Sequence, residues 1–195
     1  MFNTLRITAA SILLAGFIAV FGAAELANAH SFNALLIQGG GDGGDVYEAF
    51  RLATKERDGH ANEESDGHLG GLDVYILTSD KFDGLSDAIQ NADPDFVIFL
   101  GSLIPDNPTR AIMQSLNIVS VEVPEITAQT QAAFLEGAKS GDSNFRDRFR
   151  SDYSQDPSDM AILSYIAARL IDFAVREQGE VDDRNALRTS LAKFH

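Results

Sequence analysis

Three of the four histidines could hold a metal ion. His60 and His68 flank an acidic loop, and His30 precedes the first predicted strand. The loop joins the first predicted helix to the second strand, so all three histidines are expected at the amino ends of the strands. If cleavage follows Ala29, the free amine and imidazole of His30 could chelate Cu(II), with the other imidazoles completing a square-planar set; imidazoles and carboxylates also suit zinc. The alternative interpretation is a solvated polar loop, because no tight spacing such as H-x-x-x-H is present.

A second group of candidate residues follows the predicted strands. Parallel α/β sheets bind ligands at the carboxyl ends of their strands. A glycine-rich run over residues 39–44 ends the first strand and precedes a helix, so its backbone N–H groups could hold an anion or a carboxylate. The alternative is that these glycines only form a tight turn. The residues predicted to contact a ligand at this edge are Gly41, Gly43, Ser79, Gly101, Ser102 and Glu125.

The same glycine run matches the dinucleotide-binding fingerprint G-x-G-x-x-G by letter. We discount this match, because a run so rich in glycine matches by chance and because Asp42 and Asp45 would repel phosphate. The sequence contains no G-x-S-x-G elbow and no cysteine nucleophile. It therefore predicts a binding protein rather than an enzyme, with no cofactor beyond the copper or zinc alternative.

Short apolar runs and helical periodicity predict the elements that position these residues. The helix over residues 45–57, for example, is indicated by apolar residues at i, i+3, i+4 and i+7 from Val46. Strands are predicted over residues 33–38, 72–78, 95–100 and 117–123, with helices over 45–57, 85–92, 107–116, 128–139, 145–153, 159–178 and 183–193. The alternation predicts an α/β fold: a three-layer, doubly wound parallel sheet of about four strands, followed by C-terminal helices.

The first 29 residues predict a secretory signal peptide. Arg6 is followed by an apolar run over residues 12–21 and by the triplet Ala27-Asn28-Ala29, whose first and third residues are small. These are the parts of a cleavable leader, and the run is shorter than the roughly 20 apolar residues that a membrane span needs. We expect cleavage after Ala29, a single domain over residues 30–195, a periplasmic location and no membrane span in the cleaved chain.

The charge of the chain limits its partners. Acidic residues outnumber basic residues by 29 to 15, so the formal net charge is −14. This charge argues against nucleic acids and anionic lipid surfaces. It favours either plain solubility or a cationic ligand or metal. The absence of cysteine excludes disulfides and thiolate chemistry.

Two further segments carry motifs in a characteristic order. Residues 47–80 contain Y-E-A-F-R-L-A-T-K-E-R, then the pair Gly70-Gly71, then L-D-V-Y-I-L-T-S-D. Residues 145–191 contain F-R-D-R-F-R-S-D-Y-S-Q-D-P-S-D-M-A, then Y-I-A-A-R-L-I-D-F-A, then D-D-R-N-A-L-R-T-S-L. The first segment resembles the opening βαβ unit of the type 1 periplasmic solute-binding proteins, the leucine/isoleucine/valine-binding kind. The second is similar to the late helices of that family.

The resemblance implies a fold and a ligand class. Members of the family are much longer and hold an amino acid or amide between two α/β lobes, so this chain resembles the first lobe alone. In the family, the loop after the third strand holds the ligand through backbone groups and hydroxyls, and here it reads Gly101-Ser102. The loop after the fourth strand, residues 123–127, lacks the family's small residues. The implied partners are a small amino-acid-like or polar solute and an ABC transporter permease.

A chain reduced to one lobe also predicts a protein partner. The missing lobe would leave an apolar surface at the carboxyl edge of the sheet, where Leu103, Ile104 and Ile126 are expected, and such patches mark interfaces. Three hypotheses therefore remain open: a solute-binding component of an ABC transport or sensing system, a periplasmic copper- or zinc-binding protein, and a partner subunit that binds no solute.

Overall fold

The computed structural model describes residues 31–38, 44–57, 64–79, 84–125, 127, 129 and 144–194. Part of what the sequence predicts lies outside these residues. The leader and most of the helix over residues 128–139 do so. The predicted site and surface residues that also lie outside them are His30, Gly41, Gly43, His60 and Ile126.

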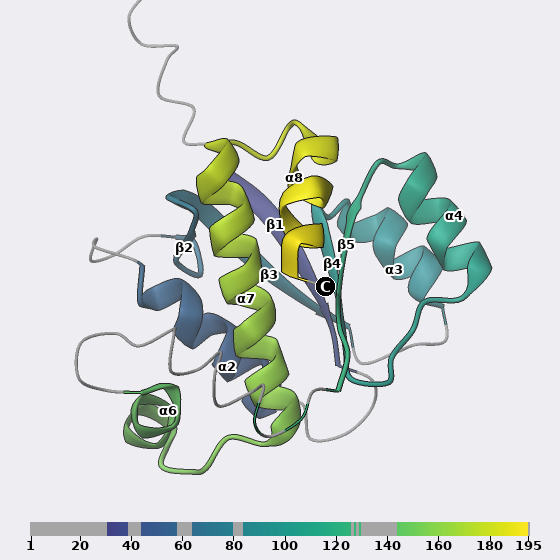
Figure 1. Ribbon diagram of the computed structural model, residues 1–195. Helices are drawn as coiled ribbons and strands as arrows, with labels where there is room; N and C mark the ends of the chain where they lie inside the picture. Colours follow the sequence, from purple (N-terminus) through teal and green to yellow (C-terminus); the bar gives the residue numbers. More distant parts are fainter. Residues whose placement is uncertain are drawn as a thin grey trace, which may run out of the picture.

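A five-stranded sheet in the order β2-β3-β1-β4-β5 forms the centre of the fold (Figure 1). Its four longer strands are β1 (Ser31–Ile37), β3 (Leu72–Ser79), β4 (Phe96–Leu100) and β5 (Val119–Val123). β1 pairs in parallel with both β3 and β4, and β4 pairs in parallel with β5. The predicted α/β class is thus confirmed, and these strands overlap the four predicted ones.

The prediction of an entirely parallel sheet is wrong at one edge. β2 (His68–Leu69) pairs antiparallel with β3 and places His68 opposite Asp73. The intervening Gly70 and Gly71 have φ angles of +66° and +89°. Positive φ at both positions is what a two-residue hairpin turn with the correct twist requires. A strand of two residues leaves no periodicity to detect in the sequence.

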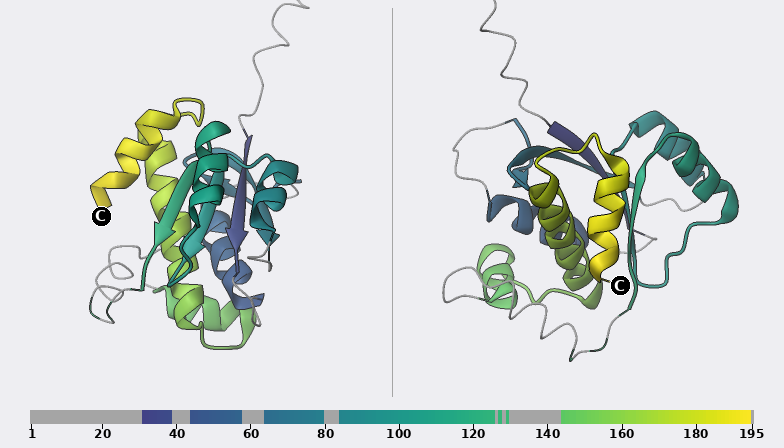
Figure 2. Two further views of the ribbon diagram at one scale, coloured as in Figure 1. Left: turned by 90° about the vertical axis from the view of Figure 1, so that its right-hand side faces the viewer. Right: turned by 45° about the horizontal axis from the view of Figure 1, so that its top comes forward.

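Helices cover both faces of the sheet (Figure 2). One face, called the front face here, carries α2 (Gly44–Lys55), α6 (Phe145–Tyr153), α7 (Asp159–Gln178), α8 (Arg184–Leu191) and η1 (Ala192–Phe194). The opposite, back face carries α3 (Leu85–Ala92) and α4 (Asn107–Ser115). The predicted layering, with helices on each side of the sheet, is therefore present.

Local sequence signals set the ends of the helices. Ser158 begins α7, because its hydroxyl accepts the Ala161 N–H at 3.1 Å. Asp106 begins α4 in the same way, accepting the Thr109 N–H at 2.9 Å. Side-chain oxygens at this position satisfy N–H groups that the first turn leaves without a partner. Gly179, with a φ of +76°, ends α7 at the predicted residue.

Each face of the sheet buries its own apolar cluster. The front cluster joins the sheet to α2, α6, α7 and α8 and includes Phe32, Phe50 and Phe96, each at most 2% exposed. The smaller back cluster joins the sheet to α3 and α4; its buried members are Leu35, Ile37, Leu85, Ile89, Val97, Phe99, Met113 and Ile118. The central strands are buried on both faces, which explains why they read as continuous apolar runs.

Candidate functional site

The carboxyl ends of β4 and β5 meet the beginning of α7. The Gly101 N–H donates to the Val123 carbonyl at 2.8 Å, which holds the loop after β4 beside the end of β5. Gly101 has a φ of +63°, and a Cβ atom there would lie 3.1 Å from the Met160 Sδ and 3.8 Å from the Glu125 Cγ. Its backbone conformation and the close approach of α7 both favour glycine. The structure thus brings two predicted ligand contacts, Gly101 and Glu125, together.

The two predicted serine contacts lie apart from each other. Ser79 ends β3, which β1 separates from β4, and its carbonyl accepts the Gln38 N–H at 2.9 Å. It lines a cavity of about 510 Å³ between β1, β3 and α3. Ser102 is exposed in the loop after β4, next to Gly101. The predicted residues that the structure describes therefore share one edge of the sheet but do not line one cavity.

A smaller cavity lies beside Gly101. It measures about 220 Å³, and its walls include Leu103, Ile104 and Pro124. Ile104 is 64% exposed. The sequence predicts exposed apolar side chains at this edge. Ile104 is such a side chain, whereas Leu103 is only partly exposed.

Of the predicted metal ligands, the structure describes His68 alone. Its Nε2 lies 2.8 Å from the Asp73 Oδ1 across the β2–β3 hairpin, and its side chain is 12% exposed. Within the described ranges, no group of three histidine or acidic side chains is placed to hold a metal ion. Because His30 and His60 lie outside those ranges, the proposed three-histidine set remains a prediction.

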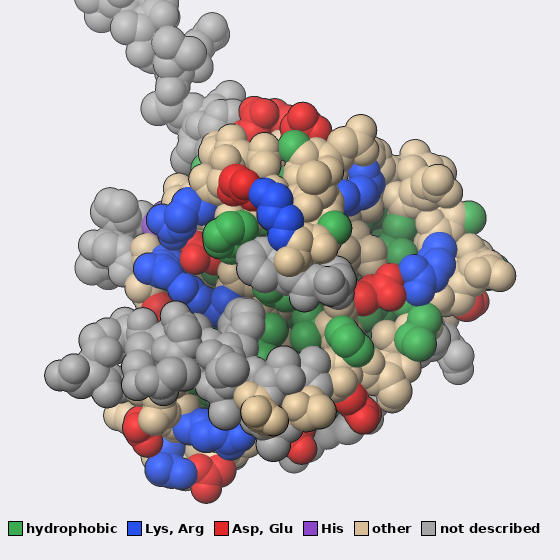
Figure 3. All heavy atoms as spheres, viewed as in Figure 1, with side chains coloured by type: hydrophobic (Ala, Val, Ile, Leu, Met, Phe, Trp, Pro, Cys, Tyr) green, Lys and Arg blue, Asp and Glu red, His purple; other side chains and the backbone are tan. Residues whose placement is uncertain are grey.

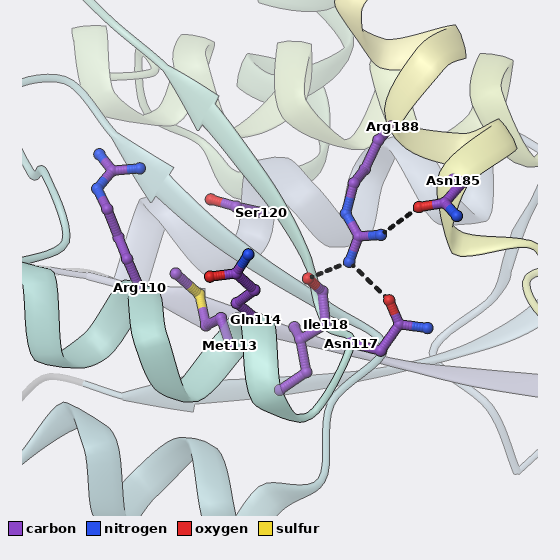
Figure 4. A pocket seen from close by; sticks show the side chains of 8 residues that line it. All are labelled: Arg110, Met113, Gln114, Asn117, Ile118, Ser120, Asn185 and Arg188. Atoms are coloured by element: carbon purple, nitrogen blue, oxygen red, sulfur yellow. Dashed lines mark hydrogen bonds between the residues drawn. The ribbon is translucent and has the colours of Figure 1, made fainter.

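A pocket that the sequence analysis did not identify runs along β5. It measures about 600 Å³ and lies between α4, β5 and α8 (Figure 4). Its lining residues are Arg110, Met113, Gln114, Asn117, Ile118, Ser120, Asn185 and Arg188. The arginines come from segments far apart in the sequence, and no local motif joins them. Only the placement of α8 beside β5 could have revealed this pocket.

One charge in this pocket is already neutralised. Arg110 Nη1 and Nη2 donate to the two carboxylate oxygens of Glu122 at 2.7 and 3.2 Å. The hydrogen bond to Glu122 raises the pKa of Arg110. The Ser120 hydroxyl also donates to Glu122, at 3.2 Å. Arg110 therefore shows how a carboxylate is bound at this edge of the sheet.

The most buried charge of the front face belongs to Asp172 in α7, which is 3% exposed. Its Oδ1 accepts the Gly70 N–H at 2.8 Å and Arg176 Nη2 at 2.9 Å. Arg57 and Arg169 contact its other oxygen at 3.4 and 3.5 Å. Burial alone would raise the pKa of Asp172, but the Gly70 hydrogen bond and the arginines outweigh it and lower that pKa. Figure 3 shows Lys and Arg side chains gathered to the left of α7, on the side toward β2.

A second buried polar cluster joins α6 to α7. The Tyr165 hydroxyl donates to Glu56 Oε2 at 2.8 Å and accepts from Arg148 Nη2 at 3.0 Å, while Arg148 Nε donates to Glu56 Oε1 at 2.6 Å. Burial, then the Glu56 charge, raises the pKa of Tyr165. Each polar group has partners within the fold, which indicates a structural role for the cluster.

Comparison with protein-family models, with curated proteins and with solved structures gave no match. Among the helices that the structure describes, none is both long enough and apolar enough to cross a bilayer.

Proposed function

We propose that this protein is a periplasmic solute-binding component, folded as a single lobe of the type 1 solute-binding kind. It takes a small amino-acid-like or polar solute at the carboxyl edge of its sheet. The observation that carries this proposal is the packing of residues 145–191 against residues 47–80. These are the two segments whose motifs resemble that family, and α7 of the late segment packs along α2 of the early one.

The glycine pair of the early segment fits the long helix of the late segment. The Gly70 N–H donates to the Asp172 carboxylate at 2.8 Å. A Cβ atom at Gly70 would lie 2.4 Å from Val175 Cγ1, so a larger residue would displace α7. The glycine at position 70 is thus required by its contact with α7 of the late segment. This supports treating the two segments as parts of one lobe.

The beginnings of α2 and α7 also meet. The Ser158 N–H donates to Asp45 Oδ2 at 3.1 Å, and the Ser164 hydroxyl donates to the Val46 carbonyl at 2.7 Å. These contacts hold the start of α7 at the edge where the solute is proposed to bind. Backbone N–H groups and the Ser102 hydroxyl there would hold the solute's carboxylate, and Glu125 would pair with its amino group.

A thermal-shift screen, followed by calorimetry, tests this proposal with amino acids, amides and small organic acids on the full-length chain. A solute at 100 times its dissociation constant should stabilise the protein by about 2.7 kcal/mol. Glu125→Gln and Ser102→Ala should weaken the binding, whereas Ser115→Ala, exposed on α4, should leave it unchanged. The proposal fails if no compound stabilises the chain at millimolar concentration, or if the edge variants bind as the control does.

Export and delivery to an ABC transporter permease form the second part of the proposal. The leader over residues 1–29 supports it. Cell fractionation followed by N-terminal sequencing should recover a chain that begins at His30 from the periplasm. An uncleaved chain retained in the cytoplasm would contradict this part and leave the binding measurement unaffected.

A partner subunit is the second candidate function, and the exposure of Ile104 favours it. This side chain stands beside Leu103 and Pro124 at the edge that a second lobe would cover. Light scattering should then show an assembly that Ile104→Glu disrupts. A monomer at micromolar concentration would exclude self-association through this edge.

A further inference from the structure

Arg188 differs from most arginines of this acidic chain in its partners. Its Nη1 donates to Asn185 Oδ1 at 3.1 Å, and its Nη2 donates to Asn117 Oδ1 at 3.0 Å and to the Ile118 carbonyl at 3.1 Å. All three acceptors are neutral. No carboxylate of the described residues forms an ion pair with this guanidinium, although the chain contains 29 acidic residues.

Neutral oxygens orient a guanidinium without cancelling its charge. The three acceptors hold the Arg188 fork in one position, but only an anion can neutralise it. Hydrogen bonds between an arginine and an oxyanion are about twice as strong as those between neutral groups. Because Arg188 is oriented in advance, an oxyanion that reaches it finds the donor already in place.

The surroundings of Arg188 form a site rather than an open surface. Arg188 stands on one side of the 600 Å³ pocket and Arg110 on the other, with Gln114 between them (Figure 4). The floor is apolar, because the side chains of Met113 and Ile118 line it. The volume lies in the range of small-molecule sites. A charged wall and an apolar floor suit a ligand with an anionic group on a short carbon skeleton.

We propose that this pocket binds a small organic oxyanion, with the ligand's carboxylate or phosphate group on Arg188 and its carbon skeleton over Met113 and Ile118. None of the predicted ligand contacts at the carboxyl edge lines this pocket. The site is therefore independent of the solute site proposed above, and either can fail without the other.

Glu122 sets the affinity of this site. It occupies both Nη atoms of Arg110, as a ligand carboxylate would, and its charge repels an incoming anion. Glu122→Gln removes that charge and frees Arg110 to turn toward the pocket. The variant should bind the oxyanion several-fold more tightly than the original chain.

Calorimetric titration of the full-length chain with succinate, with glycerol phosphate and with inorganic phosphate tests the proposal. At least one probe should bind saturably at a single site, and the three titrations distinguish a carboxylate from a phosphate ligand. Arg188→Gln should raise the dissociation constant about tenfold or more, since it removes a charge-assisted hydrogen bond. Arg146→Gln removes one exposed cation from α6 and should leave binding unchanged.

A second variant keeps the test decisive if Arg188→Gln fails to fold. Gln114→Trp fills the pocket from an exposed position on α4 and leaves Arg188 in place, so it should also weaken binding. The proposal is overturned if no probe binds at 10 mM, or if Arg146→Gln weakens binding as much as Arg188→Gln does. Binding that Glu125→Gln abolishes and Arg188→Gln spares would assign the anion to the carboxyl edge instead.

Discussion

The two faces of the sheet are held by different kinds of interaction. On the front face, buried polar clusters around Asp172 and Tyr165 join α7 to the β2–β3 hairpin, α2 and α6. On the back face, α3 and α4 are held by the smaller apolar cluster, and the Arg110–Glu122 ion pair beside it is largely exposed. The back face therefore keeps charged groups within reach of solvent, where a ligand can meet them.

This difference separates charged groups that hold the fold together from charged groups that can bind a ligand. A buried carboxylate that has four partners, as Asp172 has, is already satisfied and has nothing left to offer a ligand. Arg188 of α8 lies at the β5 edge, where the helices of the front and back faces meet, and its described partners at the rim of the pocket are neutral oxygens that leave its charge uncancelled. If the comparison is right, variants of the front clusters should lower stability, and variants of the β5 pocket should change binding with little effect on stability.

The largest loss of stability should come from Gly70→Ala. The added Cβ would lie 2.4 Å from Val175 Cγ1 and 2.8 Å from the Arg176 backbone nitrogen, at a φ of +66°. We expect a loss of about 3–4 kcal/mol from overpacking and backbone strain together, measured by urea denaturation. Gly71→Ala is the matched control, because its Cβ meets nothing within 4 Å; it should cost only about 1 kcal/mol.

Asp172→Ala should cost nearly as much, about 3 kcal/mol. The variant leaves the Gly70 N–H without its acceptor and Arg169, which is 14% exposed, without its carboxylate. Urea denaturation measures the loss, and Glu180→Ala, an exposed position beyond α7, provides the control. A loss below about 1 kcal/mol would mean that the cluster is not what joins α7 to the hairpin.

The same carboxylate should give the original chain a pH dependence. The pKa of Asp172 is lowered in the fold from its usual value of 3.8, so the folded state favours the ionised form. Its contribution to stability is complete above that usual pKa and is lost as the pH falls below it. In Asp172→Asn, the free energy of unfolding should therefore fall less steeply below pH 4. The same slope of unfolding free energy against pH below pH 4 in the two proteins would contradict this.

Tyr165→Phe should have a smaller effect, about 2 kcal/mol, because it removes a hydroxyl that bonds two charged groups. The ring stays in place against Phe145, whose centroid lies 4.2 Å away. Tyr75→Phe removes a hydroxyl from a partly exposed residue on β3 and should change stability by less than about 0.5 kcal/mol. Equal losses of stability for the two variants in thermal denaturation would contradict the stabilising role of the front-face polar cluster.

Ile104→Ser should have the smallest effect, within about 0.5 kcal/mol, because the side chain is 64% exposed. Thermal denaturation of the isolated chain measures it. A larger loss at higher protein concentration, absent at low concentration, would show that Ile104 is covered by another copy and would sharpen the case for a partner subunit.

Local patterns were sufficient to predict the longer strands and the helices that the structure describes. The bounds of α3, α6 and α7 agree with the prediction residue for residue, because each has a capping or breaking residue at its ends. The buried strands β1 and β4 were found because both of their faces are apolar. The hairpin strand β2 was missed, since its two residues exist as a strand only through their pairing with β3.

The candidate sites were harder to predict, because they depend on contacts between distant residues. The proximity of Gly101 and Glu125 followed from the parallel sheet, in which successive carboxyl ends share an edge. Arg188 reads in the sequence as one cation on an amphipathic helix. Its importance appears only when α8 lies beside β5, about 70 residues earlier in the chain, where Asn117 meets it.

The contacts of α7 with α2 and with the β2–β3 hairpin also bear on how the protein folds. They join residues far apart in the chain: Val46 to Ser164, 118 positions later, and Gly70 to Asp172, 102 positions later. A nascent chain that ends before residue 158 lacks α7 and α8, so the front cluster that contains Phe32 and Phe96 is incomplete. Such long-range closure is slow. Folding of the front face therefore depends on residues 159–178, because α7 completes its apolar cluster.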